Sequence, residues 1–260
     1  MPANPEARSL AVFCDFENVA LGVREAKYAQ FDMDKVLERL LLKGSIVVKK
    51  AYCDWERYKE FKPAMHAASF EMIEIPHLRQ SGKNSADIRM VVDALDLCYT
   101  KEHVDTFVIV SGDSDFSPLV SKLRENAKTV IGVGVKNSSS DLLINNCDEF
   151  IYYDDLVRQD EQKRRAAKKR REAAPAGEDK KQEAYDVVLE TLNALIAERG
   201  AEEKIWGSMV KQALKRRKPG FNESYYGFRA FSDLLEEMQQ KALIKLDPDE
   251  KSGGYLLRPA

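Results

Sequence analysis

The chain has 260 residues, with 41 Lys and Arg against 43 Asp and Glu, which gives a formal net charge of −2. Because 44% of the residues are hydrophobic and 9% are aromatic, the chain can fill a packed core, and a wholly disordered protein is excluded. No apolar run reaches the roughly 18 to 20 residues that span a bilayer, and the polar residues 1–9 lack the layout of a signal peptide. We therefore expect a cytoplasmic protein with no membrane partner.

Strand-like apolar runs alternate with helix-like segments through the first part of the chain. The expected strands are residues 10–16, 45–55, 69–76, 105–113, 129–135 and 149–153. The expected helices are residues 31–43, 86–100, 116–126 and 140–146. Strands separated by helices form βαβ units, so we predict an α/β fold with a mostly parallel sheet covered on both faces.

The composition changes sharply after this part. Residues 158–181 hold ten basic and five acidic residues and almost nothing apolar, which is typical of a solvated helix or linker. Residues 182–260 then show helical patterns at 183–199, 205–217 and 226–240, followed by a hairpin pattern across Gly253 and Gly254. We predict three parts: an α/β domain at 8–157, a basic charged linker at 158–181 and a small winged helix-turn-helix domain at 182–260.

Aspartates follow two expected strands that are neighbours in the common order of such sheets. Asp15 ends the first strand, and Asp113 and Asp115 stand at the end of the fourth. In the strand order 3-2-1-4-5 these strands lie side by side where the order reverses, which is where open α/β sheets bind ligands. Asp87, at a helix start, is expected to join them. Asp93 lies six residues further on and points elsewhere, either as an outer group of the site or as an exposed acid.

Such a group of acids needs a physical reason. Carboxylates that converge without bases raise each other's pKa unless a cation binds them. Oxygen ligands favour Mg²⁺ or Mn²⁺ over zinc, and these ions can generate hydroxide and clamp a phosphodiester. The four cysteines have no CxxC spacing, which argues against a zinc ribbon or a disulfide framework. The structural alternative is that Asp15 caps a turn while Asp113 and Asp115 cap the helix that begins near Phe116.

Four sequence blocks carry a resemblance to a known family. They are DFEN at 15–18, KNSADIRMVVDAL at 83–95, SGDSDFSPLV at 111–120 and CDEFIYYDDL at 147–156. In spacing and order they resemble the NYN domain, and more narrowly the bacterial LabA-like branch of the PIN-like nuclease superfamily. The resemblance implies a Rossmann-like sheet and a metal-dependent nuclease that most often acts on RNA.

The resemblance also implies a catalytic set. Its members are Asp15, Asn18, Asp87, Asp113 and Asp115. Asp15, Asp87 and Asp113 would hold Mg²⁺ or Mn²⁺, while Asp115 would either complete the metal shell or orient the attacking water. Asn18 would donate its amide to a phosphate oxygen or position a metal-bound water.

Three further residues near these acids are candidates for RNA contacts. Ser111 shares a turn with Asp113, and Lys83 and Arg89 are the nearest basic residues in the sequence. For Lys83 and Arg89 the alternative is a solvated surface charge.

The C-terminal part carries a second resemblance. The block WGSMVKQALKRRKPGF, followed by YYGFRAFSDLL, resembles the OST-HTH or LOTUS domain, which implies a module that binds RNA or docks a protein. The basic residues near the end of its second helix form a candidate phosphate-contacting patch: Lys211, Lys215, Arg216, Arg217 and Lys218. The alternative is a basic helix end that complements the helix dipole.

These patterns favour a metal-dependent ribonuclease whose winged helix binds RNA, with DNA the less favoured nucleic acid. The alternative is a non-catalytic RNA-binding regulator that keeps the acids for metal-dependent folding or binding. A phosphatase of the haloacid dehalogenase type is disfavoured, because its DxD follows the first strand and the motif at Asp113 and Asp115 follows the fourth.

Overall fold

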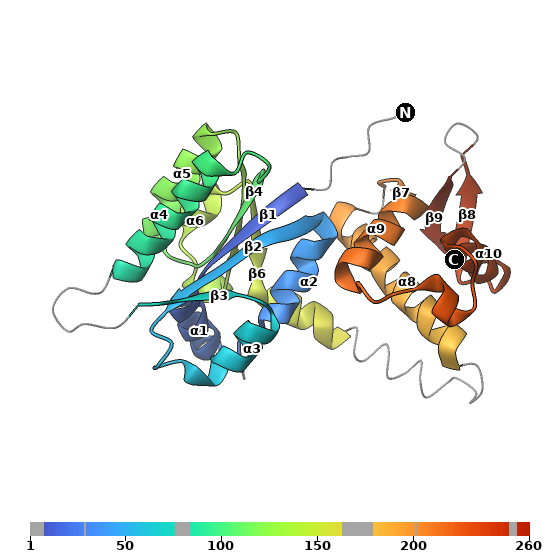
Figure 1. The fold of residues 1–260 in the computed structure, drawn as a ribbon, viewed down its shortest axis with the longest axis horizontal. Coiled ribbons are helices and arrows are strands. Elements are labelled where there is room, and N and C mark those ends of the chain that lie inside the picture. Colours follow the sequence, from blue (N-terminus) through green and yellow to red (C-terminus); the bar gives the residue numbers. More distant parts are fainter. Residues whose placement is uncertain (1–7, 29, 76–83, 163–178, 201, 250–253) are drawn as a thin grey trace. The chain divides into compact units, whose positions relative to one another are not determined.

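The fold is given by a computed structural model of the chain. The structure describes residues 8–28, 30–75, 84–162, 179–200, 202–249 and 254–260. The chain divides into two compact units, Met1–Ala166 and Ala167–Ala260 (Figure 1). Within the described ranges, no helix combines the length and the apolar character needed to cross a membrane.

The first unit is built on a six-stranded sheet. Its strands are β1 (Arg8–Asp15), β2 (Gly44–Cys53), β3 (Glu71–Glu74), β4 (Thr106–Val110), β5 (Thr129–Gly134) and β6 (Glu149–Tyr152). All neighbours in the sheet are parallel, and their order is β3-β2-β1-β4-β5-β6. The predicted parallel sheet is therefore confirmed, and its order reverses between β1 and β4, so the carboxyl ends of these two strands lie side by side.

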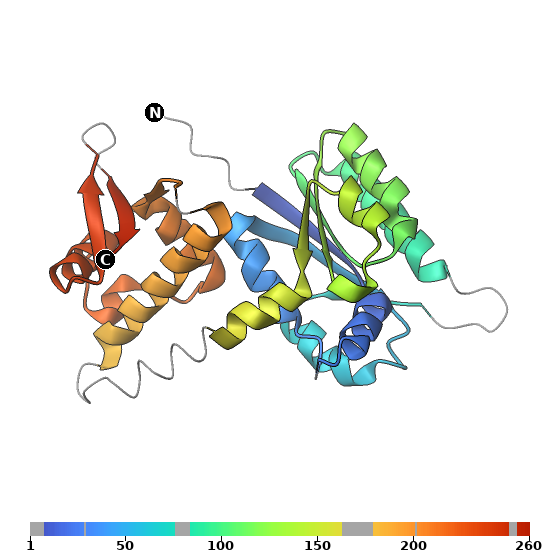
Figure 2. The same ribbon diagram turned by 180° about the vertical axis from the view of Figure 1, so that it is seen from behind.

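Helices cover both faces of the sheet (Figures 1 and 2). One face is covered by α1 (Phe16–Glu25), α2 (Met33–Lys43), α3 (Lys62–Ala67) and a helix over residues 153–162. The other face is covered by α4 (Ser85–Thr100), α5 (Ser117–Glu125) and α6 (Asp141–Asn146). A 3₁₀ turn, η2 (Ser114–Phe116), leads into α5.

The strand β1 shows how the sequence produces this layering. Leu10, Val12 and Cys14 pack into the core on one face, and Ala11 and Phe13 pack into the core on the other. Successive side chains of a strand point to opposite faces, so a strand buried on both faces must be apolar at every position. The run stays apolar until the strand ends.

The helix α1 was not predicted, since the apolar run was expected to continue as a strand to Phe16. The structure ends β1 at Asp15, whose side chain accepts a hydrogen bond from the Asn18 backbone N–H and caps α1. Phe16 begins the helix and packs against the rings of Trp55 and Phe61, with centroids 5.0 Å away in each case. This aromatic cluster comes from distant segments, so the local pattern did not show it.

In its described residues, the second unit consists of three α-helices and a small antiparallel sheet. The helices are α8 (Asp179–Arg199), α9 (Gly207–Arg217) and α10 (Phe231–Gln240), and the strands are β7 (Ile205–Trp206), β8 (Ile244–Pro248) and β9 (Tyr255–Pro259) in the order β7-β9-β8. This is the predicted winged helix-turn-helix. Residues 205–206 were expected in the second helix, but they form β7 because they pair with β9. Gly253 in the predicted wing turn, and residues 163–178 of the predicted linker, lie outside the described residues.

Candidate acidic site at the ends of β1 and β4

The register of the sheet brings Asp15 beside the loop that follows β4. Cys14 of β1 pairs with Val110 of β4, so the next residues along each strand, Asp15 and Ser111, are neighbours. The Ser111 hydroxyl donates a hydrogen bond to Asp15 Oδ2 at 3.1 Å and accepts one from the Asp113 backbone N–H at 3.2 Å. One hydroxyl thus connects two of the predicted acids.

Asn18 ties α1 to the same loop. Its Oδ1 accepts a hydrogen bond from the Gly112 backbone N–H at 2.9 Å. Gly112 is held so closely that a Cβ atom there would lie 2.3 Å from the Ser138 carbonyl oxygen. Because the side-chain oxygen of Asn18 is used in this way, its NH₂ group is the part that can bind a ligand.

Helix capping explains part of the positions of these aspartates. Asp15 caps α1, and Asp113 caps η2 by accepting a hydrogen bond from the Asp115 backbone N–H at 2.9 Å. Asp115 lies inside η2, is exposed, and is not a cap. Capping does not explain the burial of Asp15, which is only 7% exposed, because an N-cap carboxylate functions equally well in water.

The pKa of Asp15 is raised to about 7. Burial is the largest cause, because it penalises the charged form, and the negative charges of Asp87 and Asp113 add to it. The hydrogen bonds from Asn18 and Ser111 act in the opposite direction. Near neutral pH this carboxyl group is therefore divided between its protonated and ionised forms.

The pKa of Asp87 is raised to about 6. Burial is again the main cause, followed by the charges of Asp113 and Asp115. Together with the effect of Asp87 on Asp15, these interactions place the four predicted acids in one electrostatic group. We call these four aspartates the acidic cluster.

Glu17 belongs to the edge of the acidic cluster and was missed from the sequence. Its charge also raises the pKa of Asp87, while its Oε1 binds the guanidinium of Arg57 at 3.0 Å. Its place in DFEN, two residues after Asp15 at a helix start, is the signal that could have identified it.

The acidic cluster fits a hard divalent cation by its chemistry. Its candidate ligands are carboxylate oxygens, which suit Mg²⁺ or Mn²⁺ better than zinc. In the described part of the chain, none of the four aspartates is paired with Lys or Arg. Across the same residues, no three His, Cys, Asp or Glu side chains are arranged to hold a metal ion as they lie. The acids are thus close enough to repel one another without enclosing a metal position.

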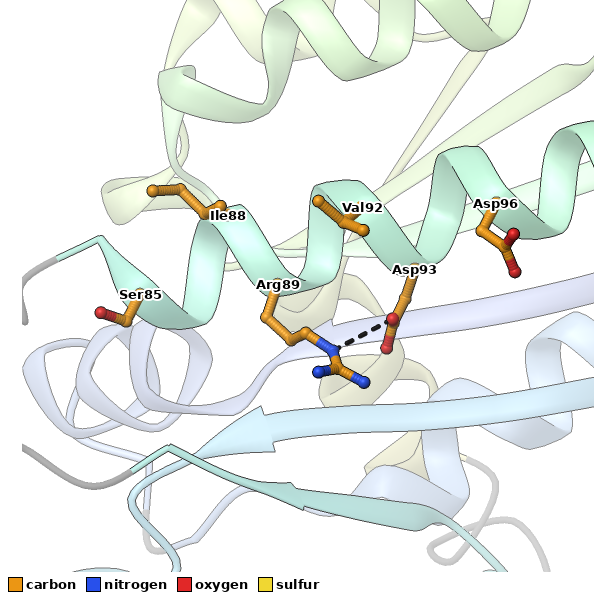
Figure 3. A pocket seen from close by; sticks show the side chains of 6 residues that line it. All are labelled: Ser85, Ile88, Arg89, Val92, Asp93 and Asp96. Carbon is orange, nitrogen blue, oxygen red and sulfur yellow. Dashed lines mark hydrogen bonds and ion pairs between the residues drawn. The ribbon is translucent and has the colours of Figure 1, made fainter.

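Arg89 and Asp93 form a separate group on another face of α4 (Figure 3). Arg89 Nε lies 3.1 Å from Asp93 Oδ1, while Asp93 Oδ2 accepts a hydrogen bond from the Tyr52 hydroxyl at 2.8 Å and pairs with Lys50 at 3.4 Å. The Asp93 side chain is only 12% exposed, so Asp93 is not the exposed acid that was one of the two expectations. Arg89 pairs with this acid instead of facing the acidic cluster.

The remaining predicted RNA contacts of this unit have different positions. Ser111 was predicted to contact RNA, but it has no exposed surface. Its hydroxyl instead donates a hydrogen bond to Asp15 and orients that side chain. Lys83 lies outside the described residues.

The basic residues near the end of α9 do not form one exposed patch. Arg217 was predicted to contact RNA, but its side chain is only 4% exposed and binds Glu190 Oε1 at 2.8 Å and Thr191 Oγ1 at 3.2 Å. Lys211 pairs with Glu223 at 3.0 Å.

Burial lowers the pKa of Arg216, which is partly covered. Of the five predicted basic residues, Lys215 and Lys218 are the exposed ones.

Comparisons with known proteins give a family to each unit. The NYN domain model matches residues 9–154, more than half of the chain, and the OST-HTH/LOTUS domain model matches residues 185–251. The chain is 30% identical over 125 residues to uncharacterized protein MJ0482 of Methanocaldococcus jannaschii. The matched segment covers 48% of this chain and 49% of that protein. The chain therefore spans about half the length of this curated relative.

A solved structure supports the same fold. The crystal structure of VPA0982 from Vibrio parahaemolyticus, a protein of unknown function, is similar to 59% of this chain over 98% of its own length. The TM-score is 0.53 and the identity is 27%. The chain belongs to the NYN domain family, within the PIN-like nuclease superfamily, and carries after it an OST-HTH/LOTUS domain, a type associated with RNA binding.

Proposed function

We propose that this protein is a metal-dependent ribonuclease that hydrolyses RNA phosphodiester bonds at the acidic cluster. The observation that carries the proposal is the grouping of four acids at the ends of β1 and β4, joined through Ser111 and neutralised by no described Lys or Arg. Their burial and mutual repulsion raise the pKa of Asp15 to about 7. Strongly perturbed acids grouped at the switch point of a sheet are typical of functional sites. Membership of a PIN-like nuclease superfamily supports the same reaction.

The acidic cluster would hold Mg²⁺ or Mn²⁺ through its carboxylate oxygens. When bound, such an ion supplies a hydroxide at neutral pH and stabilises charge on the attacking and leaving oxygens. Ser111 orients Asp15 and favours its ionised form, which is the form that binds a cation. The NH₂ group of Asn18 is the proposed donor to a phosphate oxygen, because its Oδ1 is already bound to Gly112.

RNA would be held by the C-terminal domain. We propose Lys215 and Lys218 as its phosphate contacts, since both are exposed near the end of α9. The proposed boundaries are 8–157 for the nuclease domain, 158–181 for the basic linker and 182–260 for the winged helix. RNA is proposed as the main partner, and docking of a protein on this domain is the alternative.

The test is cleavage of labelled single-stranded RNA and DNA with Mg²⁺, Mn²⁺ or EDTA. Wild type is compared with Asp15→Asn and Asp113→Asn, and the matched control is Asp96→Asn, an exposed acid on α4. We expect metal-dependent cleavage of RNA that is lost in both cluster variants and kept in the control. Equal cleavage by Asp15→Asn would refute the proposed site. RNA binding without cleavage by the wild type would favour the non-catalytic regulator.

A further inference from the structure

An open groove begins at the acidic cluster and lies between α4 on one side and α5 and α6 on the other. Asp87 and Asp115 line it, so it is continuous with the proposed catalytic site. Its volume is about 670 Å³, within the roughly 300–1,000 Å³ of small-ligand pockets. The groove is therefore large enough for one nucleotide unit.

The walls of this groove are apolar and exposed. Ile88 and Val92 of α4 and Leu142 of α6 line it, and each is more than half exposed to solvent. Ile88 and Val92 also border a second open pocket on α4, which they line together with Arg89 and Asp93 (Figure 3). Single exposed apolar side chains are ordinary, whereas these three together form one apolar wall beside the acidic cluster.

The α5 wall carries an unpaired polar group. Ser117 lines the groove, is only 5% exposed, and its hydroxyl has no hydrogen-bond partner among the residues that the structure describes. Buried hydroxyl groups are nearly always hydrogen-bonded, so an unpaired one at a groove wall is a group that a ligand in the groove can satisfy. This observation is independent of the apolar side chains.

We infer that the groove is a nucleobase subsite. The base next to the scissile phosphodiester lies against Ile88, Val92 and Leu142, and a polar edge of the base hydrogen-bonds Ser117. This inference rests on the proposed nuclease function and adds the place of the base to it.

The charges on the groove favour a base over other ligands. Asp87 and Asp115 repel an anion, so a phosphate group does not fit here without a cation. A nucleobase is neutral, has flat apolar faces, and carries donors and acceptors on its edge. An apolar wall with a single unpaired hydroxyl matches those properties.

The first test does not depend on cleavage. Methyl groups of Ile, Leu and Val are labelled in the full-length protein, and the NMR signals of Ile88 and Leu142 are assigned from Ile88→Ser and Leu142→Ser. Without metal, the neutral nucleosides adenosine or uridine should move both signals through the ring current of the base. Ribose should not move them. Equal shifts with all three compounds, or none with the nucleosides, would overturn the subsite.

The proposed hydrogen bond between Ser117 and the base is tested with a separate variant. Ser117→Ala removes the unpaired hydroxyl without cutting a hydrogen bond, so the protein should fold normally. We expect it to bind the nucleosides several-fold more weakly in the same titration. Unchanged affinity would show that Ser117 does not contact the base.

The second test uses cleavage. RNAs with one abasic nucleotide, placed at successive positions, should lose about tenfold in kcat/KM at one fixed position relative to the cut. Ile88→Ser should cause a similar loss with intact RNA and little further loss with that abasic RNA. Tyr99→Ser is the matched control, because Tyr99 is exposed on α4 but does not line the groove.

These experiments distinguish failure of the nucleobase subsite from failure of the proposed nuclease activity. Cleavage that is insensitive to abasic positions would refute the subsite and leave the nuclease standing. Nucleoside-dependent methyl shifts in a protein that cuts nothing would refute the nuclease and support the subsite. If Ile88→Ser only converts a dimer into a monomer, the apolar wall is an interface with a second copy of the chain, and the subsite is wrong.

Discussion

Ser111 Oγ donates a hydrogen bond to Asp15 Oδ2 at 3.1 Å, although the two residues are 96 positions apart. The bond joins the residue after β4 to the last residue of β1, and both partners are buried. In such a site a hydrogen bond to a carboxylate favours its ionised form. This hydroxyl therefore lowers the pKa of an acid that burial and its neighbours raise to about 7.

Ser111→Ala should move the acidic limb of the pH–rate profile of RNA cleavage to higher pH. The lost hydrogen bond favoured the ionised form, so the pKa of Asp15 rises further. A hydrogen bond to a charged group contributes about 1.5–3 kcal/mol, so we expect a shift of about one to two pH units. The measurement is kcat/KM across about pH 5 to 9. A uniform fall in rate with an unmoved limb would show that Ser111 has only a structural role.

Asp15→Asn should stabilise the metal-free first unit at alkaline pH and have little effect at acidic pH. The pKa of Asp15 is about 7 in the folded state, against a usual value of 3.8, so the folded chain binds the proton more tightly than the unfolded chain. The stability that this proton contributes is complete below about pH 4 and is lost as the pH rises through 7. Asn keeps the site neutral, so we expect the variant to gain about 2–4 kcal/mol at about pH 8.

The check is urea unfolding in EDTA at both pH values. It is followed through the fluorescence of the buried Trp55 in a Trp206→Phe background, so that the signal reports the first unit. Asp96→Asn, an exposed acid on α4, is the control and should show no such pH-dependent gain. If the free energies of unfolding of Asp15→Asn and wild type differ by the same amount at both pH values, burial does not raise the pKa of Asp15.

Mg²⁺ or Mn²⁺ should raise the stability of the wild-type first unit. An ion that binds only the folded state at 100 times its Kd adds about 2.7 kcal/mol to the free energy of unfolding. Asp15→Asn and Asp113→Asn should lose most of this increase, while Asp96→Asn should keep it. Unfolding of each variant across a metal titration measures the effect. Equal stabilisation of all four proteins would place the ion away from the acidic cluster.

Arg217→Ala should affect the stability of the second unit, whereas Lys218→Ala should affect RNA binding, although the two residues are adjacent. Arg217 is buried against Glu190 and Thr191, so its loss should destabilise the second unit by about 1–3 kcal/mol. Lys218 is exposed, so its loss should leave stability unchanged and weaken RNA binding.

Stability is read from Trp206 fluorescence in a Trp55→Phe background, and RNA affinity from a salt titration with the Asp15→Asn protein. Each lost phosphate contact should reduce the salt slope by about 0.7. If Arg217→Ala is stable and reduces the slope, the ion pair with Glu190 does not hold in solution.

The predicted strands follow from the sequence because burial on both faces leaves a local pattern. The runs around Val12, Val108 and Ile131 are apolar at successive positions, and each forms a strand near the expected limits. The helices α1 and α3 were not predicted from the sequence. Phe16 continues the apolar run of β1, and its departure into α1 depends on Trp55 and Phe61, which lie far along the chain.

The roles of polar residues were less predictable. Ser111 and Arg217 have the residue types of nucleic-acid contacts, yet both are buried and bind other side chains. Glu17 and Ser117 were not singled out from the sequence. Their significance lies in neighbours from other elements, Asp87 for Glu17 and Leu142 for Ser117.

The sequence by itself determined the alternation of strands and helices, the parallel sheet, and the placing of Asp15 at the end of β1 and of Asp113 in the turn that follows β4. Those features depend on side-chain periodicity and on the reversal of strand order, which local patterns encode. Only the tertiary structure decided which charges are paired, which hydroxyls are buried and where a groove opens beside the acids. The physical reason is that burial, pKa and pairing depend on the distances between groups, and those groups lie far apart in the chain.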